Sequence, residues 1–221
     1  MKTSTLSFDT AGGATTAYVA TPDESNGKAV VVIQEWWGLN DHIKDIARRY
    51  ASEGFVAIAP DLYRGKIATN SEDAGRMMND LNLEDGLDTI RNSMDAARAE
   101  YAFTHFGITG FCMGGTYALR AACELDGISA AAPFYGDIPD EDVLRKLRAP
   151  TIFISGTKDA WINTEKVATL EDAAEKYELT VHSVKYDADH AFFNDTRPEV
   201  YDEVAARDAW ALVVGFFSDK L

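Results

Sequence analysis

The chain has 221 residues, of which 46% are hydrophobic and 26% charged, a composition typical of soluble globular proteins. This length suits one large α/β domain or two small ones, and it is long enough to bury a sizeable core. The 36 acidic residues outnumber the 21 basic ones, and the net charge is −15, so we expect neither nucleic acid nor an anionic membrane as a partner.

The N-terminal residues and the cysteine spacing bear on the expected cellular compartment. Met1 to Thr5 lead into a polar stretch that lacks the apolar core of a signal peptide. No apolar run approaches the roughly 18 residues needed to span a bilayer. Cys112 and Cys123 would lie about 16 Å apart along one helix and its preceding turn, which is too far for a disulfide. Free thiols suit a reducing compartment, so we expect a cytoplasmic protein.

Strands and helices are predicted to alternate along almost the whole chain. Alternating polar and apolar residues at 4–9 and 14–20, joined by a turn at 11–13, indicate a hairpin of two edge strands. Mostly continuous apolar runs predict buried strands at 29–33, 55–59, 106–109, 128–136, 151–155 and 179–186. Helical spacing of apolar residues predicts helices at 41–53, 72–80, 84–100, 116–125, 140–147, 164–177 and 199–218. This alternation indicates an α/β fold with a mainly parallel, doubly wound sheet and helices on both faces, in one domain over residues 1–221.

The stretch 110–115, Gly-Phe-Cys-Met-Gly-Gly, joins a predicted strand to a predicted helix. A Gly-x-nucleophile-x-Gly pattern in this position is the nucleophile elbow of α/β-hydrolases. The elbow holds its central residue in strained backbone geometry, and glycines at its flanks avoid clashes with the neighbouring strand and helix. The central residue here is Cys112 rather than serine. The pattern therefore predicts the α/β-hydrolase fold, a three-layer sandwich, with a cysteine nucleophile.

Four polar side chains follow predicted parallel strands, and they are Glu35, Cys112, Asp159 and His190. The carboxyl ends of such strands meet at one edge of the sheet, where ligand sites form. Three of these residues occur in the order nucleophile, acid and histidine, which is the order of α/β-hydrolases. We expect Cys112 to attack an acyl carbon, His190 to carry protons, and Asp159 to orient the imidazole and stabilise its cation.

Some of these roles have other candidates in the sequence. His42 opens a helix near the expected site and remains an alternative to His190. An aspartate after a strand is commonly a turn or helix-capping residue, which is the structural interpretation of Asp159. The candidates that we regard as structural or less favoured are His105, His182, Asp187 and Asp189.

An oxyanion hole needs two backbone N–H donors aimed at the developing negative charge. We expect one from Met113, which follows the candidate nucleophile at the positive end of the elbow helix. The second is expected from Trp36, in the loop after the strand at 29–33.

Six short motifs, spread over essentially the full chain, carry a family resemblance. They are Gln34-Glu35-Trp36-Trp37-Gly38-Leu39-Asn40, Pro60-Asp61-Leu62-Tyr63, Gly110-Phe111-Cys112-Met113-Gly114-Gly115, Phe134-Tyr135-Gly136, Gly156-Thr157-Lys158-Asp159 and His190-Ala191-Phe192. With them the chain resembles the dienelactone hydrolase family, carboxymethylenebutenolidase-like proteins of the α/β-hydrolase fold. The resemblance implies a triad of Cys112, His190 and Asp159. It also implies that Glu35 lies beside the cysteine and controls the ionisation of its thiol, whose thiolate is the reactive form.

The chain departs from the founding dienelactone hydrolases where the substrate would bind. Those enzymes place an arginine four residues after the catalytic histidine to grip the substrate carboxylate. Here that position is Asn194, with Arg197 three positions later, although an arginine from the segment after Asp61 could supply a cation instead. A different lactone or small ester is therefore at least as well supported as dienelactone. The residues expected to bind substrate are Tyr135, Arg64, Arg76, Trp37 and Asn194.

The sequence thus predicts a hydrolase of carboxylic esters or lactones that forms a thioester on Cys112 and uses neither a metal nor an organic cofactor. One alternative is a general small-ester esterase or thioesterase. Another is a catalytically degenerate protein that binds ligands or senses redox state through Cys112. The expected partner is a small-molecule ester or lactone, and the expected assembly is a monomer, with a homodimer as the alternative.

Overall fold

Strands and helices alternate along residues 1–221, the part of the chain that the computed structural model describes. The strands are β1 (Lys2–Thr10), β2 (Gly13–Thr21), β3 (Ala29–Ile33), β4 (Val56–Pro60), β5 (Phe106–Phe111), β6 (Ile128–Phe134), β7 (Thr151–Gly156) and β8 (Val181–Tyr186). The helices are α1 (Asp41–Ser52), α2 (Ser71–Asp80), α3 (Leu83–Tyr101), α4 (Met113–Glu124), α5 (Glu141–Leu144), α6 (Thr164–Lys176) and α7 (Glu203–Lys220). Each predicted element is present, and the boundaries differ by a few residues. The last helix, for example, begins at Glu203 because the Asp202 side chain accepts a hydrogen bond from the Ala205 N–H and caps it.

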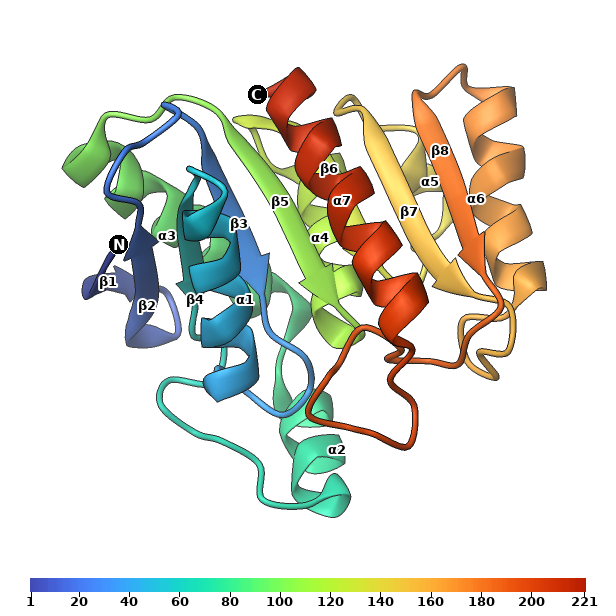
Figure 1. Ribbon diagram of the computed structural model, residues 1–221, viewed down its shortest axis with the longest axis horizontal. Coiled ribbons are helices and arrows are strands. Elements are labelled where there is room, and N and C mark those ends of the chain that lie inside the picture. Colours follow the sequence, from blue (N-terminus) through green and yellow to red (C-terminus); the bar gives the residue numbers. More distant parts are fainter.

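All eight strands join one sheet in the order β1-β2-β4-β3-β5-β6-β7-β8 (Figure 1). The pairs β1·β2 and β2·β4 are antiparallel, and every other neighbouring pair is parallel. The prediction of a mainly parallel, doubly wound sheet is therefore confirmed. The prediction that both hairpin strands lie at the edge is wrong for β2, which pairs with β4 on its other side. Local alternation cannot reveal this second partner, because strand order is set by contacts between distant segments.

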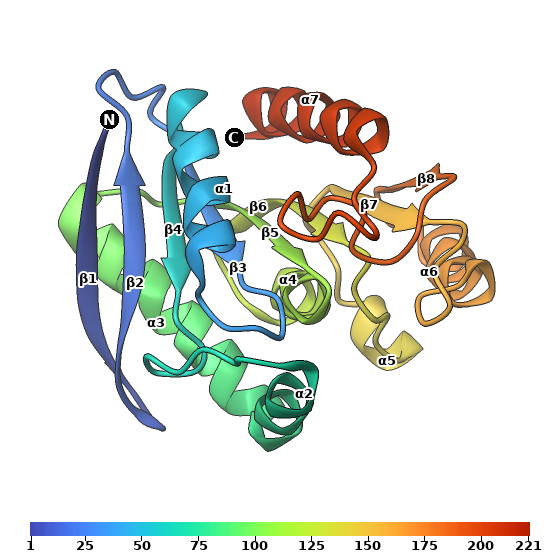
Figure 2. The same ribbon diagram turned by 60° about the horizontal axis from the view of Figure 1, so that its bottom comes forward.

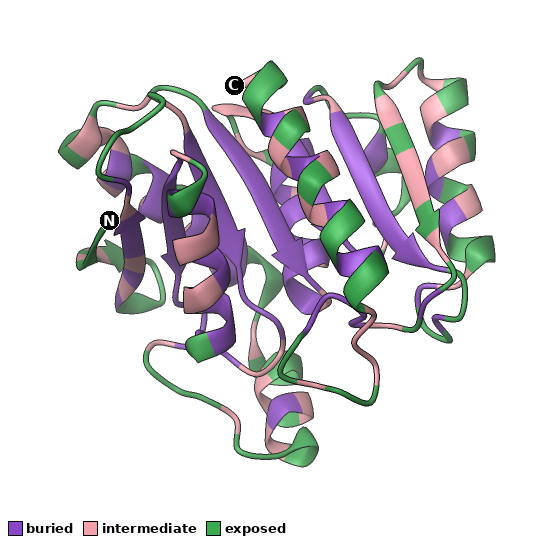
Figure 3. Ribbon diagram, in the orientation of Figure 1, coloured by how far each residue is buried: buried purple, intermediate pink, exposed green.

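The sheet is covered on both faces, which gives three layers (Figure 2). Helices α1 and α7 pack on one face, and α3, α4 and α6 pack on the other. Alternate residues of β3 enter the two cores, Val31 and Ile33 on the α4 side and Val30 and Val32 on the α1 side. Figure 3 shows the central strands buried along their length. A continuous apolar run is what such a doubly covered strand requires.

The parallel strands all point toward the lower edge of the sheet in Figure 1. Loops that leave β3, β5, β7 and β8 therefore meet at this edge, and α2 lies beyond it. Among the helices, none combines the length and the apolar character needed to cross a membrane.

Candidate active site

A cavity of about 870 Å³ opens at the carboxyl ends of the parallel strands. Glu35, Cys112 and His190 all line it, each from the loop or turn that follows a different strand. Asp159 follows β7 and lies behind His190, within hydrogen-bond distance of its imidazole. The structure therefore brings the four expected polar side chains to one place. The imidazole of the alternative candidate, His42, is instead buried beside Asp195 and does not line the cavity.

Cys112 occupies the turn between β5 and α4 with φ 55° and ψ −118°, a backbone conformation that non-glycine residues rarely adopt. Packing around the turn explains the flanking glycines. A Cβ on Gly110 would lie 2.1 Å from the Gly114 carbonyl oxygen, and one on Gly115 would lie 2.3 Å from the Phe134 carbonyl oxygen. The Cys112 N–H donates to the same Phe134 oxygen at 3.1 Å. The turn is held on both sides, and the thiol is presented to the cavity.

His190 and Asp159 form a close pair, with 2.6 Å between Nδ1 and Oδ2. The other carboxylate oxygen of Asp159 accepts the backbone N–H groups of Trp161 at 2.8 Å and Ile162 at 2.9 Å. Burial by itself would raise the pKa of Asp159, but the hydrogen bond from His190 and those from the backbone hold the pKa below its ordinary value. Asp159 is thus a buried carboxylate that orients the imidazole.

The remaining ring nitrogen of His190, Nε2, is buried and has no hydrogen-bond partner within the protein. Two aromatic rings flank the imidazole: those of Tyr135 and Trp161, each with its centroid 5.0 Å from that of the imidazole. Because Asp159 already engages Nδ1, the unpartnered Nε2 is the nitrogen available to exchange a proton in the cavity.

Glu35 is almost fully buried, and its carboxylate accepts a hydrogen bond of 2.7 Å from Asn194 Nδ2. The orientation of that amide is determined, because its Oδ1 accepts from both the backbone N–H and the hydroxyl of Thr196. Burial raises the pKa of the Glu35 carboxyl to about 7 in spite of this hydrogen bond. Glu35 can therefore hold or release a proton near neutral pH.

The thiol of Cys112 is held in its neutral form. Burial, and then the charge of the Glu35 carboxylate, raise the pKa of the thiol to about 12. The N–H of Met113, at the start of α4, opposes this rise. That N–H and the N–H of Trp36 make no hydrogen bond to an oxygen elsewhere in the protein. Both residues line the cavity, and their role as oxyanion-hole donors stays a prediction.

The structure separates the five expected substrate-binding residues into two groups. Tyr135 and Trp37 line the cavity. Asn194 does not line it, because its side chain is buried beneath Glu35. Arg76 also lies outside it and is 69% exposed, paired with Asp73.

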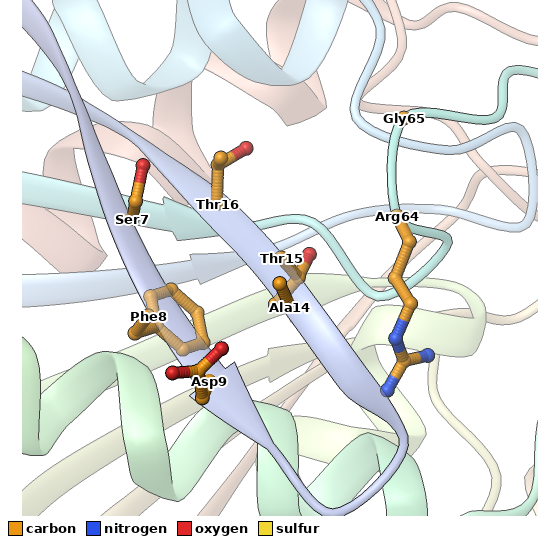
Figure 4. Close-up of a pocket in the computed structure, with 8 residues that line it drawn as sticks. All are labelled: Ser7, Phe8, Asp9, Ala14, Thr15, Thr16, Arg64 and Gly65. Carbon is orange, nitrogen blue, oxygen red and sulfur yellow. The ribbon is translucent and has the colours of Figure 1, made fainter.

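Arg64 belongs to a different part of the surface. Its guanidinium donates to Asp85 through Nη1 at 2.9 Å and through Nη2 at 2.6 Å. It lines a separate pocket beside the β1–β2 hairpin rather than the cavity that holds Cys112 (Figure 4). Arg64 and Arg76 thus both lie outside the cavity that holds Cys112, and each is paired with an aspartate there.

Several cavity-lining residues were not among the expected substrate contacts, and they include Lys158, Trp161, Lys166 and Arg197. The sequence could have indicated Trp161 as a cavity residue, because it is an aromatic residue two positions after the candidate acid Asp159. No group of three or more His, Cys, Asp or Glu side chains is arranged to hold a metal ion.

The fold and the site define a class, the α/β-hydrolases, with a cysteine at the elbow. The profile of the Dienelactone hydrolase family matches residues 15–221. Protein usf of Aquifex pyrophilus is 39% identical over 228 residues, which cover 98% of each chain. A protein of Aquifex aeolicus named "Putative carboxymethylenebutenolidase" is 36% identical, again over 98% of each chain.

Solved structures agree with these relatives. The crystal structure of a "Putative Dienelactone Hydrolase" from Klebsiella pneumoniae has a TM-score of 0.90, with 30% identity and 98% of each chain covered. The chain therefore belongs to the dienelactone hydrolase family. It is a carboxylic ester hydrolase of this type, and the expected family and enzyme class are confirmed.

Proposed function

We propose that the protein hydrolyses a carboxylic ester or lactone through a Cys112–His190–Asp159 triad and a thioester intermediate. The observation that carries the proposal is the pairing of Asp159 with His190 Nδ1 at 2.6 Å, which leaves Nε2 free in the same cavity as the elbow thiol. This is the arrangement that lets one imidazole exchange protons with a thiol, a leaving group and a water.

In the first half of the reaction the Cys112 thiol gives up its proton, which reaches His190 by way of Glu35, and the sulfur attacks the acyl carbon and forms a tetrahedral oxyanion. The N–H groups of Met113 and Trp36 stabilise that oxyanion. The bond from carbon to the leaving oxygen then breaks, and this oxygen takes a proton from His190, which leaves an acyl thioester on the enzyme. In the second half His190 removes a proton from water as the water oxygen attacks the thioester. The bond from carbon to sulfur then breaks and His190 returns its proton to the sulfur, so that the acid and the free thiol are released.

Glu35 is assigned control of the thiol proton. Its charge helps to raise the pKa of the Cys112 thiol to about 12, so the free enzyme holds an unreactive thiol. Its own pKa of about 7 allows it to accept the thiol proton when a substrate changes its surroundings. The arrangement would protect the nucleophile from alkylation and oxidation between turnovers.

The experiment compares two cysteine variants on p-nitrophenyl acetate. Cys112→Ala should lower kcat by roughly a thousandfold or more, because the nucleophile is lost. Cys123→Ala is the matched control, since Cys123 is buried within α4 and packs in the core away from the cavity. Acid-quenched wild-type enzyme should carry an acetyl group on the peptide that contains Cys112, as measured by mass spectrometry.

Two results would contradict the proposal. Turnover that survives complete alkylation of Cys112 would exclude covalent catalysis by this residue. A cysteine that reacts with peroxide yet supports no ester hydrolysis would favour the binding or redox-sensing alternative. A panel of lactones and aryl esters, with and without a carboxylate, separates a lactonase from a general esterase or thioesterase.

A further inference from the structure

Trp161 is an unusual residue for the surface, because its side chain is 66% exposed at the mouth of the active-site cavity. An exposed indole forgoes the stabilisation that burial of so large an apolar side chain gives. Two further exposed apolar side chains, Met78 and Leu83, line the same cavity from α2 and α3. Apolar surface that is gathered at a cavity mouth indicates a ligand that covers it.

The position of the indole is defined by the same contacts that orient the triad. The Trp161 N–H donates to Asp159 Oδ1 at 2.8 Å, so its backbone is anchored to the acid. Its ring lies edge-on to the imidazole of His190, with centroids 5.0 Å apart and an interplanar angle of 84°. The indole is therefore held next to the imidazole that takes part in the reaction.

The side of the cavity that Trp161 occupies follows from the chemistry. His190 gives its proton to the leaving oxygen, so a residue packed against His190 faces the alcohol portion of the ester rather than its acyl portion. We infer that Trp161 is a specificity-determining residue that stacks on an apolar, aromatic leaving group. This inference rests on the proposed function, because it uses the role of His190.

The charges around the cavity favour an uncharged leaving group. Each lysine or arginine that lines the cavity is already paired with a carboxylate: Lys158 Nζ with Asp187 at 3.2 Å, Lys166 Nζ with Asp137 at 2.6 Å and Arg197 Nε with Glu199 at 2.8 Å. A substrate carboxylate would have to share one of these cations with its present partner and would also meet a protein of net charge −15. The substrate class is therefore a neutral aryl ester.

The test uses two acetates that share one acyl group, 2-naphthyl acetate and ethyl acetate. Both produce the same acetyl thioester, so a difference in kcat/KM between them arises at binding and acylation, before deacylation. Trp161→Ala should lower kcat/KM for 2-naphthyl acetate by about tenfold and leave the value for ethyl acetate within about twofold of wild type. Trp161→Phe should recover most of the loss, because it restores an aromatic face.

Val204→Ala is the matched control, since Val204 is an apolar residue of α7 that is 68% exposed and does not line the cavity. An equal loss on both acetates would overturn the inference, because it would show that Trp161 acts by positioning His190. So would wild-type enzyme that prefers 4-carboxyphenyl acetate to phenyl acetate. Hydrolysis that proceeds without Cys112 would instead overturn the proposed function, and with it the inference.

Discussion

The buried carboxyl of Glu35 makes the stability of the protein depend on pH in a way that one substitution should remove. Glu35→Gln replaces the carboxyl with a group of the same shape that does not ionise. The Oδ1 of Asn194 is occupied by Thr196, so its Nδ2 must face residue 35, where the oxygen of the glutamine can accept the same hydrogen bond. The substitution therefore removes the ionisation and keeps the contact.

The magnitude follows from the two pKa values of Glu35. Its ordinary value is 4.5, and burial raises the pKa to about 7 in the folded protein. Between pH 4.5 and about pH 7 the folded protein holds a proton on Glu35 that the unfolded chain has released. The protonated carboxyl therefore contributes its full stabilisation below pH 4.5, and this stabilisation is lost as the pH rises through the folded-state pKa of about 7. At about 1.4 kcal/mol per tenfold change in an equilibrium, the accumulated loss is about 3 kcal/mol near pH 8.5 and less than about 1 kcal/mol near pH 5.

The assay is urea unfolding of wild type and Glu35→Gln, followed by tryptophan fluorescence at about pH 5 and about pH 8.5. We expect the free energy of unfolding of the variant, relative to wild type, to increase by about 2 to 3 kcal/mol between the two conditions. Glu24→Gln is the matched control, because the side chain of Glu24 is exposed in the loop after β2 and meets water in both states. A difference between Glu35→Gln and wild type that stays constant with pH would refute the reasoning, because it would mean that burial does not perturb Glu35.

The other predictions concern the thiol, the triad and the elbow. Glu35→Gln should also speed alkylation of Cys112 by iodoacetamide at about pH 8, because the lost carboxylate charge no longer raises the pKa of the thiol. The rate should rise by about tenfold for each unit by which the pKa of the thiol falls, and an unchanged rate would contradict the role of Glu35. Asp159→Asn should lower kcat on p-nitrophenyl acetate by about 10³ to 10⁴, because the amide can turn its NH₂ toward the imidazole and favour the wrong tautomer of His190. A loss below about tenfold would argue against Asp159 as the residue that orients the imidazole. Gly110→Ala should destabilise the fold by at least about 2 kcal/mol in urea unfolding, since the added Cβ would lie 2.1 Å from the Gly114 carbonyl oxygen, and wild-type stability would mean that the turn can relax.

Periodicity and local motifs were sufficient to predict the helices and strands, the parallel sheet and the elbow. The apolar, mostly β-branched run Ala29–Ile33 predicts a strand that is covered on both faces of the sheet. In the structure all of its residues are buried. The elbow was equally predictable, since its glycines reflect contacts of the turn with the strand and helix that flank it. Strand ends share one edge in a parallel sheet, so the sequence alone predicts that Glu35, Cys112 and His190 lie together, as they do in the cavity.

The sequence did not determine which side chains contact the substrate, because this depends on ion pairs and hydrogen bonds between groups that are distant along the chain. Arg64 looked available for a substrate, but Asp85 on α3 takes its guanidinium. Asn194 stood where the founding enzymes bind substrate, but in the tertiary structure it lies beneath Glu35 and supports that carboxylate. Trp161 had no role in the sequence, and only its place against His190 gives it one. A motif can determine which chemistry is present, because that chemistry resides in local backbone geometry and residue type. The tertiary structure decides which charges remain free and which surfaces face the substrate, because both depend on what the rest of the chain packs against them.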